Sequence, residues 1–203
     1  MVELGQVEGV TTVALLTDMS IPLGLTVGNA LEVTESIEVL AGGGPPDVVE
    51  LTVALAREML AAVGREEHDP AELLASGAGM DVWRSLIKAQ GGDPDAKLPV
   101  ARETHVIITE QVGVLQSLDA LAVGEAAWRL GAGRARKEHA VQPAAGVQLH
   151  AKPGAPVRAG QPLMTLHTDT PRRFEMAREA LAGAYSIGSA KAPERPLILD
   201  RIA

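Results

Sequence analysis

The chain has 203 residues, no cysteine and a formal net charge of −8. A chain of this length buries about 70% of the surface that it exposes when unfolded, and without cysteine it has neither a disulfide framework nor a thiolate metal site. Aromatic residues make up 2% of the sequence and 26 acidic residues outnumber 18 basic ones, which argues against a nucleic-acid partner. The N-terminal residues are acidic and no apolar run approaches the ~20 residues of a membrane span. We therefore expect a cytoplasmic protein without a membrane partner.

The first half of the chain is acidic and mostly helical. Residues 1–100 contain 16 acidic and 5 basic side chains. Residues 10–16 form a continuous apolar run rich in β-branched residues, which is typical of a strand buried on both faces of a parallel sheet. Apolar residues at helical spacing predict the other elements. The expected helices cover residues 1–8 and 80–90 and begin near residues 29, 47 and 70.

Capping signals mark three of these helix starts. Asn29 is the expected N-cap of the first, with Glu32 as the reciprocal acidic residue. Asp47 follows a Gly-Pro cluster and is expected to cap the second. Asp69 precedes Pro70, the arrangement typical of a cap followed by proline at the first helical position.

The stretch QGGDPDAKLP, residues 90–99, predicts a linker between two domains, residues 1–99 and 100–203. The second half contains 10 acidic and 13 basic residues and has a mixed α+β pattern. Its expected strands are residues 104–109, 112–118, 147–152, 162–167 and 197–202, and its expected helices are residues 120–130 and 174–182.

Common catalytic motifs are missing from the sequence, including the dinucleotide and P-loop glycine patterns, the H-E-x-x-H zinc motif and the G-x-S-x-G elbow. The histidines lack metal-ligand spacing, so we expect them in turns or on the surface. They are His68, His105, His139, His150 and His167.

Three further features have a chemical and a structural interpretation. Residues 130–134, LGAGR, could bind an anion through backbone N–H groups and Arg134, but a helix C-cap is favoured. Asp18 follows the apolar strand, where it is either a ligand-binding residue or a turn residue. The loop of residues 22–28 offers carbonyls to a cation, with Glu35 as carboxylate, although such a loop is more often a connection beside a solvated glutamate.

Two long stretches resemble the thymidine and pyrimidine-nucleoside phosphorylases. The first is LLTDMSIPLGLTVGNALEV, residues 15–33, and the second comprises LGAGR and residues 145–169, AGVQLHAKPGAPVRAGQPLMTLHTD. The resemblance spans essentially the whole chain in order. It implies an α/β fold in which part of a mixed-sheet lobe with packed helices precedes an α+β module of hammerhead or barrel-sandwich type.

The resemblance also implies an activity and a cofactor. Members of this family cleave a pyrimidine nucleoside with phosphate as co-substrate, giving the base and (deoxy)ribose 1-phosphate. Some bind a structural potassium or calcium ion, whose ligands would correspond here to the carbonyls of Leu23 and Thr26 and the side chain of Glu35. Thr26 replaces a small apolar residue of some members.

The segments with which the family binds phosphate and the base have no counterpart in this sequence, and no catalytic residue is assigned. We therefore expect no phosphorolysis by the chain alone, and association with the missing N-terminal half or with itself. The alternative is a non-catalytic interaction or carrier module, because residues 152–163 resemble a biotinyl or lipoyl hairpin. Lys152 lacks the sequence setting of a modified lysine.

Overall fold

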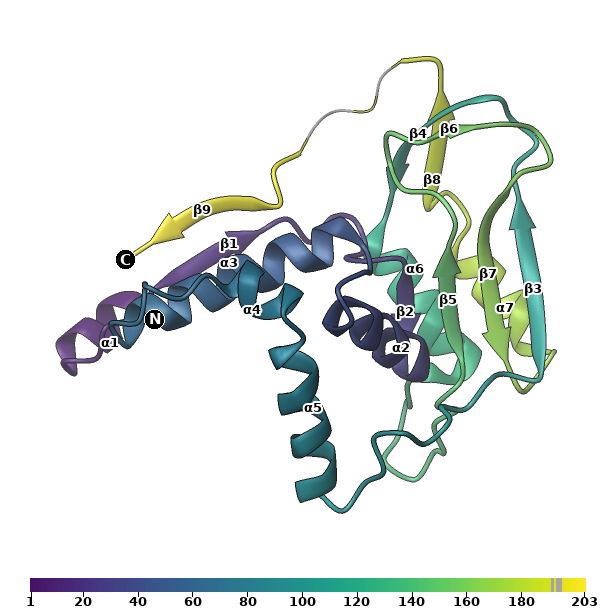
Figure 1. Cartoon of the computed structure of the whole chain (residues 1–203). Helices are drawn as coiled ribbons and strands as arrows, with labels where there is room; N and C mark the ends of the chain where they lie inside the picture. Colours follow the sequence, from purple (N-terminus) through teal and green to yellow (C-terminus); the bar gives the residue numbers. More distant parts are fainter. Residues whose placement is uncertain (191, 193–194) are drawn as a thin grey trace. The chain divides into compact units, whose positions relative to one another are not determined.

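The computed structural model describes residues 1–190, 192 and 195–203. The chain forms two compact units (Figure 1). Unit 1 consists of Met1–Asp18, Ile37–Ala96 and Arg195–Ala203, and unit 2 consists of Met19–Ser36 and Lys97–Glu194. The domain boundary expected at residue 99 stays a prediction, although the chain passes between the units close to it.

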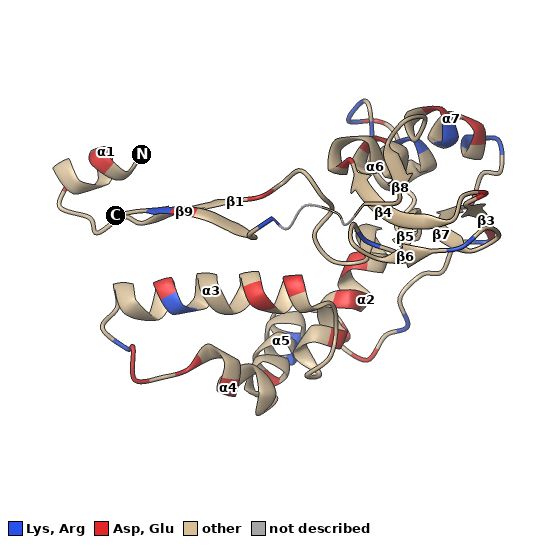
Figure 2. Ribbon diagram, turned by 90° about the horizontal axis from the view of Figure 1, so that it is seen from above, with Lys and Arg blue, Asp and Glu red and all other residues tan. Residues whose placement is uncertain are grey.

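Unit 1 is a set of helices beside a two-stranded sheet. Its helices are α1 (Val2–Val7), α3 (Pro46–Ala62), α4 (Pro70–Ala75) and α5 (Ala78–Ala89), and its strands are β1 (Ala14–Thr17) and β9 (Ile198–Ile202). The helix α2 (Asn29–Leu40) begins in unit 2 and its last residues belong to unit 1. On α3, acidic residues outnumber basic ones three to one, as Figure 2 shows by colour.

The apolar run near the N-terminus does not form a strand buried on both faces. β1 pairs antiparallel with β9, in a register that joins Ala14 to Ile202, and the Leu16 side chain is 44% exposed. An apolar run shows that a segment is able to be buried, but it does not identify the element that covers it. β9 is tied to α3 by Arg201, whose guanidinium donates to both carboxylate oxygens of Glu58 at 2.6 and 2.9 Å.

Unit 2 contains two antiparallel sheets. The four-stranded sheet has the order β2 (Thr26–Gly28), β5 (Gly146–Leu149), β7 (Pro162–Thr168), β3 (Glu103–Ile108). The three-stranded sheet has the order β6 (Pro156–Val157), β4 (Gly113–Leu118), β8 (Tyr185–Gly188). The helices of this unit are α6 (Ala120–Ala127), which continues as the π-helical turn η1 (Trp128–Ala132), and α7 (Arg173–Ala180). The mixed α/β class expected from the sequence is confirmed.

The main hydrophobic core lies in unit 2. It combines alternate residues of the central strands, such as Val147 and Leu166, with Val123 and Leu130 from the helical segment, all at 0% exposure. Alternation with a period of two places these residues on one face of the sheet. The core therefore fixes β5, which borders β2, and β7, which borders β5.

The helix starts follow the sequence signals to different degrees. Asp69 caps α4 as expected, because its side chain accepts from the Ala71 N–H. Glu32 accepts from the Gly28 N–H at 3.0 Å, one residue before the expected donor Asn29. Asn29 is the first residue of α2, and its side-chain amide donates to the Ala132 carbonyl at 2.7 Å. The cap of α3 is Pro45, so the expectation for Asp47 was wrong by two positions.

Candidate functional site

The junction of β2 and α2 brings together the residues expected to bind a cation. The loop before β2 contains Leu23, β2 begins at Thr26, and Glu35 lies on α2. Glu35 is 8% exposed, and its Oε1 accepts from the Leu25 N–H at 2.8 Å. The carboxylate therefore lies against the loop backbone at Leu25, a residue that precedes Thr26 directly, and the alternative of a solvated glutamate is wrong.

The register of β2 leaves the Thr26 carbonyl unused by the neighbouring strand. The Leu25 carbonyl accepts from the Leu149 N–H at 2.7 Å, and Thr26 is the next residue, opposite Gln148. In an antiparallel ladder the backbone groups of alternate residues point away from the partner. The Thr26 carbonyl therefore points to the outer edge of β2, where the ladder does not compete for it.

The Thr26 hydroxyl is a second oxygen at this junction. Its Oγ1 is buried and has no hydrogen-bond partner among the described residues. A buried polar group without a partner costs about 1–3 kcal/mol, so a ligand or water at this position would recover free energy. The oxygen donors at the junction, two carbonyls, one hydroxyl and one carboxylate, are of the kind that hard cations prefer. Among residues 1–190, 192 and 195–203, no three His, Asp or Glu side chains are grouped as metal ligands.

Two histidines lie near each other on the four-stranded sheet. His150 follows β5 and its Nε2 lies 2.7 Å from Thr165 Oγ1 on β7. His167, also on β7, has a buried Nε2 without a partner in the described part of the chain. Burial lowers the pKa of His167 below its usual value, and the neighbouring His150 lowers it further. His167 is therefore a half-buried residue of the strand expected over residues 162–167, and only its Nε2 is fully buried.

The LGAGR stretch ends a helix. Gly131 has φ = 117° in the π-helical turn η1, a conformation that favours glycine, and its carbonyl accepts from the Gln142 N–H at 2.8 Å. The Leu130 carbonyl accepts from Thr168 Oγ1 at 2.7 Å. Carbonyls rather than N–H groups are thus engaged here, in agreement with the favoured C-cap interpretation. Arg134 donates to the Lys137 carbonyl at 3.3 Å.

Asp18 lies directly after β1, where its N–H donates to the Leu197 carbonyl at 2.9 Å. This bond extends the pairing of β1 with β9 by one residue.

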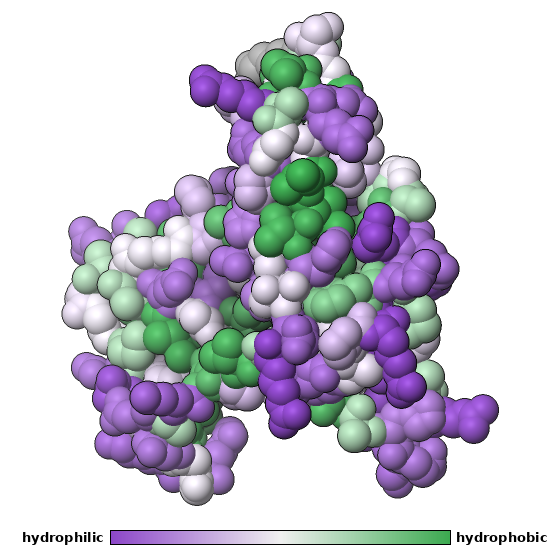
Figure 3. Space-filling model, turned by 90° about the vertical axis from the view of Figure 1, so that its right-hand side faces the viewer, coloured by the Kyte–Doolittle hydropathy of each residue, from purple (hydrophilic) through white to green (hydrophobic). Residues whose placement is uncertain are grey.

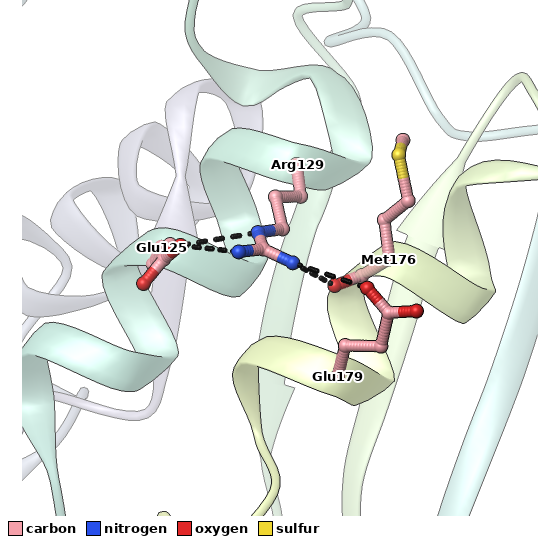
Figure 4. A network of polar contacts seen from close by, with 4 residues as sticks. All are labelled: Glu125, Arg129, Met176 and Glu179. Carbon is pink, nitrogen blue, oxygen red and sulfur yellow. Dashed lines mark hydrogen bonds and ion pairs between the residues drawn. The ribbon is translucent and has the colours of Figure 1, made fainter.

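A polar network that the sequence analysis did not identify joins α6 to α7 (Figure 4). Arg129 donates to Glu125 at 2.6 and 3.1 Å, to the Met176 carbonyl at 3.0 Å and to Glu179 at 3.4 Å. The i, i+4 spacing of Glu125 and Arg129 was a visible signal, but the contacts to α7 connect residues 47 and 50 positions apart. The network holds α6 and η1 against α7, and it includes none of the residues expected to bind the cation.

The mixed α/β structure of unit 2 is consistent with the family that its sequence matches. Residues 114–188 match the family model described as "Pyrimidine nucleoside phosphorylase C-terminal domain". The expected resemblance to the thymidine and pyrimidine-nucleoside phosphorylases is confirmed, and the chain is similar to a C-terminal portion of these relatives.

Relatives in three bacteria align with nearly the whole chain. A thymidine phosphorylase of Mycobacterium tuberculosis H37Rv is 55% identical over 202 residues, which are 100% of this chain and 47% of the relative. The pyrimidine-nucleoside phosphorylase of Bacillus subtilis 168 is 35% identical over 96% of this chain and 47% of its own length. That of Geobacillus stearothermophilus is 33% identical, over 100% and 49%. The chain thus spans about half the length of the curated relatives it matches.

Proposed function

We propose that this chain forms the C-terminal portion of an enzyme that cleaves pyrimidine nucleosides with phosphate. The observation that carries the proposal is the 55% identity over 202 residues to a thymidine phosphorylase, which runs through both units rather than through residues 114–188 alone. The carrier-module alternative is not favoured, because the relatives are phosphorylases and the similarity extends far beyond the hairpin.

The cytoplasmic location stays a prediction. None of the helices in the described part combines the length and apolar character that a bilayer crossing requires.

The proposed reaction is a displacement at the sugar. A phosphate oxygen forms a bond to C1′ while the bond from C1′ to the base nitrogen breaks, and the electron pair of that bond leaves with the base. The products are the free base and (deoxy)ribose 1-phosphate. Positive groups beside the phosphate and the departing base would stabilise both charges. We assign none of these groups to this chain, whose role we place in the scaffold and the cation site.

A phosphorolysis assay tests this proposal. Thymidine and uridine are each incubated with phosphate and the chain, alone and mixed with a separately expressed N-terminal half of the Mycobacterium tuberculosis relative. We expect release of thymine or uracil only from the mixture, and none without phosphate. Base release by the chain alone would contradict the proposal that the groups that bind phosphate and base lie outside this chain. A mixture that forms a complex but releases no base would contradict the proposed phosphorolysis.

We further propose that Leu23, Thr26 and Glu35 bind a potassium or calcium ion that is structural in role. The support is the burial of Glu35 against the loop, the Thr26 carbonyl that β5 does not use, and the buried Thr26 hydroxyl. When bound, the ion would hold the loop to α2 electrostatically. The residues of the chain position the loop, and the ion takes no part in the displacement.

Thermal denaturation in the presence of each cation tests this site. We expect millimolar calcium or potassium to raise the Tm of the chain relative to sodium at equal ionic strength, and Glu35→Gln to abolish the increase. Glu38→Gln is the matched control, because Glu38 is an exposed residue of the same helix. If Glu35→Gln lowers the Tm equally with every cation, Glu35 only braces the loop and the ion site is excluded.

We also propose that unit 1 associates with the rest of the phosphorylase, or with itself when that part is absent. Exposed apolar side chains cover its elements, among them Leu16 on β1, Leu55 and Met59 on α3, and Leu86 on α5. Such surfaces favour association. Binding of an apolar dye should fall when the complementing half is added; an isolated monomer that binds no dye would contradict this.

A further inference from the structure

The outer edge of β3 is suited to pair with a second copy of this chain. β3 is the last strand of the four-stranded sheet, and its inner edge is bonded to β7 (Figure 1). Between Glu103 and Ile108 it contains no lysine and no proline, the residues that commonly protect an exposed edge. An edge of this kind is a template for a further strand.

The direction of the backbone groups on β3 follows from its pairing. Thr109 donates to the Gln161 carbonyl at 3.0 Å and accepts from the Gly160 N–H at 2.7 Å, so its backbone faces the β7 side. The irregularity between Ile107 and Ile108 skips a residue on β7, and the alternation along β3 continues through it. The backbone groups of Thr104, Val106 and Ile108 therefore point to the outer edge.

Two of these residues, Val106 and Ile108, present apolar side chains on the exposed face. Val106 is 44% and Ile108 54% exposed. Figure 3 views the molecule from the side on which β3 lies, and an apolar patch bordered by hydrophilic side chains is visible on that face. A groove of about 700 Å³ runs beside the strand, between its residues 105–108 and the segment from Arg178 to Tyr185. The groove leaves room for a neighbouring chain.

The sequence of this edge is complementary to itself. In a two-fold antiparallel pair centred on Val106, residues whose numbers sum to 212 lie opposite each other. Val106 then faces Val106 of the partner subunit, and Thr104 faces Ile108 of the partner subunit. Just beyond the strand, Arg102 faces Glu110 of the partner subunit, and the symmetry makes this ion pair twice. Both Arg102 and Glu110 are exposed, and opposite charges at facing positions stabilise a strand pair.

We propose that β3 pairs antiparallel with β3 of a second copy about a two-fold axis at Val106. The pair exchanges main-chain hydrogen bonds at Thr104, Val106 and Ile108, joins the two four-stranded sheets and is flanked by two Arg102–Glu110 ion pairs. A two-fold pair uses the same surface on both copies, so it closes as a dimer. This interface is independent of the proposed phosphorolysis and of the exposed apolar surface of unit 1.

A charge-swap cycle measured by sedimentation equilibrium tests the pairing. Arg102→Glu and Glu110→Arg each place like charges opposite each other and should raise the dimer Kd at least about fivefold. The double variant restores opposite charges, and its Kd should return to within about twofold of the original. Arg158→Glu, which changes an exposed arginine outside the edge, is the control and should leave the Kd unchanged.

Oxidative cross-linking gives a second measurement. The chain has no cysteine, and in a hydrogen-bonded antiparallel pair the facing Cα atoms lie about 5.5 Å apart, within disulfide range. Val106→Cys should form a covalent dimer on mild oxidation, whereas Val141→Cys, at an exposed valine elsewhere in unit 2, should not. A chain that is monomeric at about 200 μM would overturn the proposal. The proposal would also be overturned by a dimer whose Kd is the same in the charge-swap variants as in the original chain and whose Val106→Cys variant does not cross-link.

Discussion

At the scale of single residues, the surroundings of His167 oppose ionisation of its imidazole ring. Its Nε2 is buried without a partner in the described part of the chain, and burial together with His150 lowers its pKa from 6.5. In the unfolded chain the imidazole takes up a proton as the pH falls through about 6.5. The folded state takes up that proton only at lower pH, so the unfolded state is favoured as the pH falls.

We therefore expect the free energy of unfolding to decrease between pH 7 and pH 5, and His167→Gln to make this decrease smaller. Urea denaturation at a series of pH values measures the slope for both proteins. His139→Gln removes an exposed histidine and serves as the control. Equal slopes in the original chain and in His167→Gln would show that the ring is protonated equally easily in both states.

At the scale of elements, Arg129 is the main polar connection between α6 and α7. Its guanidinium, 28% exposed, bonds to Glu125 on its own helical segment and to the Met176 carbonyl and Glu179 on α7 (Figure 4). A partly buried guanidinium with several acceptors contributes more than an exposed pair, because its bonds are charge-assisted and less screened.

Arg129→Met should therefore lower the free energy of unfolding by about 1–2 kcal/mol. Arg129→Lys should lower it by less, because a single ammonium group cannot bond to both helices as the guanidinium does. Arg158→Met, at an exposed arginine, should change it by less than about 0.5 kcal/mol. Denaturant curves give these values. A change in Arg129→Met as small as in the control would mean that apolar packing alone holds the helices.

Elements with local signals were predictable from the sequence, and contacts between distant segments were not. Asp69 and Pro70 identified the start of α4 because the cap and the helix are adjacent in the chain. The pairing of β1 with β9 connects residues 14 and 202, and nothing in the apolar run indicates that partner. At the candidate site, the residue types at Leu23, Thr26 and Glu35 could be chosen from the resemblance. The burial of Glu35 against Leu25 could not, because it depends on how α2 folds back on the loop.

At the scale of the whole molecule, the two units bury apolar surface very unequally. The core cluster lies entirely within unit 2, whereas Val39 and Val53 are the buried aliphatic side chains of unit 1 in the part that the structure describes. Since burial of apolar surface is the dominant stabilising contribution, unit 2 should be the more stable of the two.

The two tryptophans allow this to be measured, since Trp83 lies in unit 1 and Trp128 in unit 2. With Trp128→Phe and Trp83→Phe as single-tryptophan proteins, the fluorescence of Trp83 should change at a lower urea concentration than that of Trp128. Leu166→Ala should destabilise the Trp128 transition by about 2–5 kcal/mol. Leu55→Ala, at a side chain 40% exposed, should change it by less than about 0.5 kcal/mol. Coincident transitions would show that the units unfold together.

The pairing of β1 with β9 has a consequence for synthesis on the ribosome. β1 ends at Thr17 and its partner begins only at Ile198, so the ribosome adds most of the chain between the two strands. At about 5–20 residues per second, β1 waits roughly 10–40 s for its partner. The strands of unit 2 in the described part of the chain are complete once Gly188 has been added, so this unit can fold first while β1 is still unpaired and accessible to chaperones.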